Sequence, residues 1–106
     1  MVENNDNKKE ISKLLKERTE LLFIWNLEYS KGKGSTQEAR EILDKKNCKS
    51  KRIEELGGDF NNISEELFNE VKQEFLNKRL DRIDRDLAKE ITYDDLGKER
   101  KLCGGI

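Results

Sequence analysis

The chain has 106 residues, of which 42% are charged and 33% hydrophobic, and its formal net charge is −1. This length corresponds to one domain at most, and Leu, Ile, Val and Phe, at about a quarter of the chain, are enough for a small core. Histidine is absent, which excludes Ser-His and Cys-His catalysis and leaves a zinc site without half of its usual ligands.

The sequence also favours a location inside the cell. Residues 1–7 are polar, so we expect them to be disordered and to form neither a secretory signal nor a transit peptide. No apolar run approaches the roughly 20 residues of a membrane-spanning helix. The cysteines, Cys48 and Cys103, do not form a disulfide framework. We therefore expect free thiols in a reducing, cytoplasmic compartment.

Frequent Glu, Lys, Arg and Leu, together with the absence of proline, favour helix over strand. We predict an all-α fold with a single helical domain over residues 8–91. It would be a three-helix bundle, or a helical hairpin with a long, charge-laced third helix. Residues 92–106 would form a short helix and a flexible tail.

The first predicted helix covers residues 8–30. Its apolar residues recur at steps of three and four and extend around most of the circumference, which is typical of a central helix that is wrapped on several sides. Arg18 lies inside the apolar stripe. Either its stem packs while its guanidinium reaches the surface, or the buried charge needs a carboxylate or a bound anion.

The second predicted helix begins at a capping box in which Ser35 is the N-cap residue and Glu38 reaches back to it. The polar stretch 44–52 interrupts its apolar stripe. The helix either continues with only Cys48 buried or breaks near Asn47. Gly57 is predicted to follow its C-terminus in the left-handed conformation.

The third predicted helix begins near Asn62 or Ser64 and runs to about Ile91. It carries two apolar stripes, the second rotated by about a quarter turn from the first. Charged residues flank the second stripe, which is typical of a coiled-coil or helix-in-groove contact. The residues of this candidate interface are Leu76, Leu80, Ile83, Leu87 and Ile91.

From these patterns we predict a non-enzymatic helical module for protein–protein interaction, such as a small adaptor, regulator or assembly subunit. The thin core and the second stripe indicate a protein partner or self-association into an oligomer. No cofactor, metal or membrane contact is expected.

A basic cluster supports an alternative function. Five cations fall within eight residues, and such a patch can neutralise the phosphates of a nucleic acid. No aromatic residue is interleaved for base stacking. The cluster consists of Lys45, Lys46, Lys49, Lys51 and Arg52.

A second alternative comes from a resemblance. The stretch 14–22 around Arg18, followed by Lys31 and by Arg40-Glu41, resembles the helical chorismate mutases over about a third of the chain. This resemblance implies a small all-α isomerase that binds a dicarboxylate between its helices, with Arg18 as one of the substrate-binding residues.

Overall fold

The computed structural model describes residues 5–60, 63–78 and 81–97. This part of the chain is all-α, as predicted, and it contains no β-strand. The elements are α1 (Asn5–Ser30), α2 (Gln37–Glu55), α3 (Glu65–Asn77), α4 (Arg82–Glu90) and the 3₁₀ helix η1 (Tyr93–Gly97). Cys103 and the other residues of the predicted tail after Gly97 lie outside the described residues.

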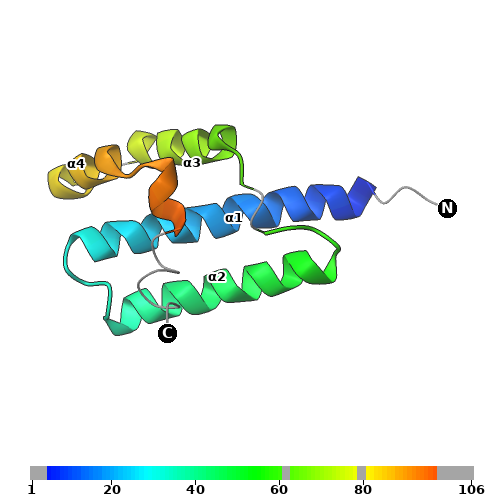
Figure 1. Cartoon of the computed structure of the whole chain (residues 1–106). Coiled ribbons are helices and arrows are strands. Elements are labelled where there is room, and N and C mark those ends of the chain that lie inside the picture. Colours follow the sequence, from blue (N-terminus) through cyan, green and yellow to red (C-terminus); the bar gives the residue numbers. More distant parts are fainter. Residues whose placement is uncertain (1–4, 61–62, 79–80, 98–106) are drawn as a thin grey trace.

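α1 is the central element of the fold. α2 runs antiparallel along one side of α1, whereas α3 and α4 lie along the other side (Figure 1). η1 also packs against α1. The molecule measures 51 × 35 × 21 Å, and its shortest dimension corresponds to about two helix diameters. Such a flat arrangement flanks α1 on both sides without enclosing it all round.

The main core lies between α1 and the three elements at the C-terminal end of the described chain. Phe23 of α1 is fully buried and stacks on Phe75 of α3 at a centroid distance of 4.8 Å. Each of the other elements adds buried apolar side chains to this cluster. Its buried members are Leu22, Phe23, Leu27, Phe68, Val71, Phe75, Ala88, Ile91 and Leu96.

α2 is one continuous helix through Asn47. Its N-cap is Thr36, whose hydroxyl accepts a hydrogen bond from the backbone N–H of Ala39 at 3.2 Å. The prediction of Ser35 as the cap is therefore wrong by one residue, because either hydroxyl is a suitable cap by type. The expectation that Cys48 would be buried is also wrong, since Cys48 is an exposed free thiol.

Both ends of the next connection follow the predicted signals. Gly57 has a φ of +86° directly after α2, as expected for a helix C-terminus. Ser64 caps α3 by accepting a hydrogen bond from the N–H of Leu67 at 3.1 Å.

The continuous third helix is not confirmed, because the chain forms two separate helices there. Lys78, which ends α3, has an extended backbone with ψ at 162°. Asp81 caps α4 by accepting a hydrogen bond from the N–H of Asp84 at 2.8 Å. Arg85 donates to the backbone carbonyls of Leu76 and Lys78 at 3.0 and 3.3 Å. These bonds satisfy carbonyl groups that a continuing helix would otherwise pair.

Candidate functional site

A groove lies along the open face of α1. The lining side chains from α1 follow steps of three and four residues, which places them on one face of the helix. The α2 side chains form one wall. The groove is shallow and open to solvent, and its volume is about 410 Å³. Its lining residues are Glu17, Glu20, Leu21, Ile24, Lys45 and Lys49.

The floor of the groove is apolar. Leu21 and Ile24 are only partly buried, and Ile24 also packs against the main core. By contrast, Thr19 and Asn26 are 0% and 2% exposed. Polar side chains are therefore covered on one face of α1, while Leu21 and Ile24 line a groove on another. This reversal of the usual pattern singles out the groove as a candidate binding surface.

The two long sides of the groove carry different charges. On the α2 side, Lys49 forms an ion pair with Glu17 at 3.1 Å, whereas Lys45 is exposed. Glu20 follows Lys16 by four residues, and Lys16 bridges to α3, so Glu20 lies on the α3 side of the floor. Among the described residues, neither Glu20 nor Lys45 has an ion-pair partner. The groove thus has an unpaired anion on one side and an unpaired cation on the other.

Two lysines hold α3 and α4 against α1. Lys16 pairs with Glu74 at 2.6 Å and with Glu70 at 3.4 Å. The hydrogen bond that Lys16 donates to Glu74 is the largest cause that raises the pKa of Lys16. Lys31 pairs with Asp84 of α4 at 3.0 Å, and the hydrogen bond that Lys31 donates to Asp84 likewise raises the pKa of Lys31. These pairs fix the positions of the helices opposite α2.

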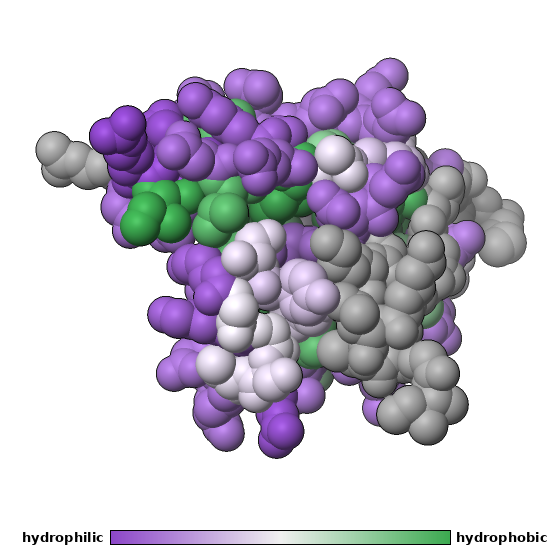
Figure 2. Space-filling model, turned by 60° about the vertical axis from the view of Figure 1, so that its left-hand side comes forward, coloured by the Kyte–Doolittle hydropathy of each residue, from purple (hydrophilic) through white to green (hydrophobic). Residues whose placement is uncertain are grey.

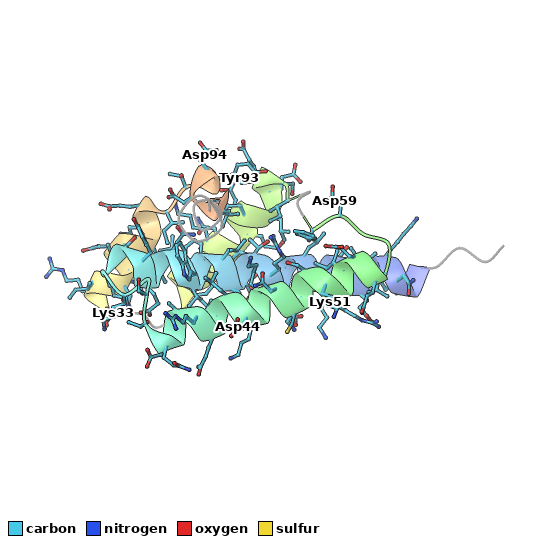
Figure 3. The ribbon with its side chains drawn as sticks, turned by 60° about the horizontal axis from the view of Figure 1, so that its bottom comes forward. Lys33, Asp44, Lys51, Asp59, Tyr93 and Asp94 are labelled. Atoms are coloured by element: carbon cyan, nitrogen blue, oxygen red, sulfur yellow. The ribbon has the colours of Figure 1, made fainter. Side chains whose placement is uncertain are left out.

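The predicted basic cluster does not form one cationic patch. Lys46 is only 7% exposed, and Lys49 is paired with Glu17. Arg52 pairs with Glu10 at 3.2 Å and with Glu55 at 3.5 Å. Lys51 projects from the side of α2 that is turned away from α1 (Figure 3), whereas Lys45 lines the groove. Binding of nucleic acid through this cluster stays a prediction. Fewer of its five cations are available to contact phosphates than the sequence alone suggests.

The predicted apolar stripe is divided in a similar way. Ile91 is 3% exposed and belongs to the main core, and Leu76 and Leu87 pack against that core. Ile83 is 67% exposed, and Leu80 lies outside the described residues. Figure 2 shows an apolar band across the upper part of the end where α4 and the α1–α2 loop lie, with hydrophilic residues above it and residues of intermediate hydropathy below it. Because α3 and α4 are separate helices, α4 can take a different direction from α3. Most of the apolar residues of the stripe therefore pack into the main core instead of facing solvent.

Arg18 is 3% exposed, so the prediction that its guanidinium could reach the surface is wrong. Its Nε donates to Ser50 Oγ at 2.6 Å, and its Nη1 donates to the Phe60 carbonyl at 3.0 Å. The guanidinium carbon also lies 4.8 Å from the centre of the Phe60 ring. These contacts join α1, α2 and the segment after α2.

The residues that resemble those of chorismate mutases have separate contacts. Arg18 points between α1 and α2 and does not line the groove. Lys31 pairs with Asp84 on α4, and Arg40 is exposed on α2. The isomerase alternative stays a prediction.

The groove itself was missed at the level of the sequence. Leu21 and Ile24 belong to the wide apolar circumference of the first predicted helix, which predicts neighbours on several sides. The one available signal is the pair Glu17 and Glu20, because two acids on the same face as two apolar residues indicate a border with solvent.

Comparisons of the chain with protein-family models, with curated proteins and with solved structures find no match. Within residues 5–60, 63–78 and 81–97, no group of three or more His, Cys, Asp or Glu side chains is placed to hold a metal ion. No helix in the same ranges is long and apolar enough to cross a membrane.

Proposed function

We propose that the protein is a non-enzymatic protein–protein interaction module that binds its partner in the groove over α1. The observation that carries this proposal is the apolar floor, Leu21 and Ile24, set between Glu20 and Lys45, two charges without ion-pair partners in the described part of the chain. The partner would present an apolar strip edged by one basic and one acidic side chain.

The shape of the site supports a protein ligand. The groove has an apolar floor and charged rims, and a helix of a partner buries its apolar face in a groove of this kind. Charged rims set the register and the rate of association more than the affinity. The apolar floor supplies the area that gains free energy when it is removed from water. The groove therefore takes over the role that the sequence assigns to the stripe on the third helix.

A pair of photo-crosslinking variants tests this proposal. The residue p-benzoylphenylalanine is placed at Lys49 in one protein and at Lys51 in the other, and both proteins are irradiated in the cells that produce them. Lys49 lines the groove, whereas Lys51 lies on the outer side of α2 (Figure 3). We expect a discrete protein conjugate from position 49 and none from position 51.

A third protein provides the control for the floor of the groove. Leu21→Asp, combined with the photo-crosslinker at position 49, should remove the conjugate while far-UV circular dichroism stays that of the parent. Equal labelling from positions 49 and 51, or no conjugate from position 49, would show that no protein occupies the groove.

A further inference from the structure

We infer that the protein partner in the groove is a second copy of this chain, related to the first by a two-fold axis that runs along the groove. This inference rests on the proposed function and names the partner. It is carried by the arrangement of charge on the two sides of the floor.

The charges are self-complementary. Lys45 lies on the α2 side of the floor, and Glu20 lies on the α3 side. Rotation by 180° about an axis parallel to the groove turns a copy face to face with the original and exchanges its two sides. Glu20 of each copy then faces Lys45 of the other. A single operation therefore supplies a partner to both unpaired charges, as expected for an isologous interface.

The floor matches itself under the same operation. Leu21 and Ile24 lie between the two charged sides, so the apolar strip of one copy meets the apolar strip of the other. The paired residues Glu17 and Lys49 neutralise each other at 3.1 Å within each copy. They therefore add no like-charge repulsion to the contact.

The broad face of the molecule is large enough for a contact of standard size. α1 contains 26 residues, which corresponds to a length of about 39 Å. A contact strip about 20 Å wide along this helix has an area close to the ~800 Å² per partner of a standard interface. The broad face of the molecule measures 51 × 35 Å, so a strip of this size fits on it.

Charge exchange between variants tests the inference directly. The molar mass of the purified full-length chain is measured by light scattering after gel filtration over a range of protein concentrations. We expect a dimer of the 12.5 kDa chain that dissociates on dilution. Glu20→Lys and Lys45→Glu should each weaken the dimer about a hundredfold, because each change places like charges at both symmetric contacts.

Recombination of the variants is the decisive step. An equimolar mixture of the Glu20→Lys and Lys45→Glu proteins should restore dimers, since each charge then faces its opposite in a mixed pair. The double variant that carries both changes should dimerise with itself. Asp44→Lys and Lys51→Glu make the same charge changes on the outer side of α2 (Figure 3) and should leave the dimer intact. Circular dichroism confirms that each variant is folded.

Several results would overturn the inference. These are a wild-type chain that stays monomeric at every concentration, single variants that dimerise like the wild type, and a dimer that is lost with Ile83→Asp but kept with Ile24→Asp. The last result would place the contact on α4. If the purified chain is monomeric while position 49 still crosslinks to a different protein in cells, the proposed function stands and this inference fails. If neither is seen, both fail.

Discussion

The buried guanidinium of Arg18 joins three segments that are distant in sequence. It donates to Ser50 on α2 and to the carbonyl of Phe60, 32 and 42 positions further along the chain. Hydrogen bonds from a charged donor contribute more than neutral ones, and a buried acceptor that loses its donor is costly. We therefore assign Arg18 to the stability of the fold rather than to ligand binding.

Arg18→Met tests this assignment. The substitution keeps most of the apolar stem and removes both hydrogen bonds, so we expect the free energy of unfolding to fall by about 2–3 kcal/mol. Lys13→Met is the control, because Lys13 is exposed on the same helix, and it should have little effect. Urea unfolding followed by circular dichroism measures both. An equal effect of the two substitutions would contradict a structural role for the buried contacts.

The sequence shows that Arg18 is a cation within an apolar stripe, but it does not predict the hydrogen-bond partners of Arg18. A cation in an apolar stripe must be paired or must reach water, and this choice follows from the residue type alone. The partners depend on how the chain turns after α2. Gly58 packs so tightly that a Cβ there would lie 2.9 Å from a methyl carbon of Ile11 and 3.0 Å from one of Ile53. This close approach brings Phe60 back to α1, and no local pattern encodes it.

Helix ends are the elements that the sequence predicts least well. The range 62–91 has helical periodicity throughout, and i,i+4 charge pairs support a continuous helix. The quarter-turn offset between its two stripes is the signal of a break. Asp81 has the residue type of an N-cap, and it interrupts the helix because its carboxylate binds the N–H of Asp84. The break lets Ile91 share one core with Phe75.

The ion pair between Lys31 and Asp84 fixes α4 to the end of α1, and its contribution should depend on pH. Their side chains are 24% and 26% exposed, so we expect Lys31→Met to lower the free energy of unfolding by about 0.5–1 kcal/mol. The pKa of Lys31 is raised above its ordinary value of 10.5. The contribution should therefore be complete below pH 10.5 and be lost as the pH rises through the higher pKa of the folded state.

Unfolding curves at several pH values between neutrality and the alkaline limit measure this contribution as the difference between the wild type and Lys31→Met. Lys33→Met is the control, because Lys33 is exposed in the loop after α1 (Figure 3). A difference for Lys31→Met that persists unchanged at the most alkaline pH would show that its charge does not act through the pair.

At the scale of the whole molecule, the groove depends on how many elements pack against α1. The spacing of apolar residues in the sequence does not give this number. The apolar circumference of α1 predicts a helix enclosed on several sides. In the described part of the chain, α1 is flanked only by α2, by the short pair α3 and α4, and by the five residues of η1. One strip of α1 therefore remains at the surface. The sequence predicts the amount of apolar surface, whereas the topology decides which part stays open.

The same topology makes α1 common to both halves of the molecule, so we expect unfolding to be one cooperative transition. Trp25, the only tryptophan, is 1% exposed and stacks on Tyr29 at 5.3 Å. Two residues before Trp25 on the same helix, Phe23 stacks on Phe75 of α3. Loss of either side exposes apolar residues of α1, which favours all-or-none unfolding. Tryptophan fluorescence and far-UV ellipticity should give coincident urea curves at a fixed protein concentration.

The variant Phe75→Ala tests whether the two sides of α1 unfold together. It removes a ring that is 6% exposed from the α3 side of α1, and such truncations lower the free energy of unfolding by about 3–5 kcal/mol. Trp25 stacks on Tyr29 and not on Phe75. A shift of its fluorescence curve in Phe75→Ala would therefore show that the two sides of α1 unfold together. Both curves should shift together to lower urea. If α1 and α2 formed an independently stable hairpin, ellipticity would shift while the fluorescence midpoint stayed in place, and the single core would have to be treated as two.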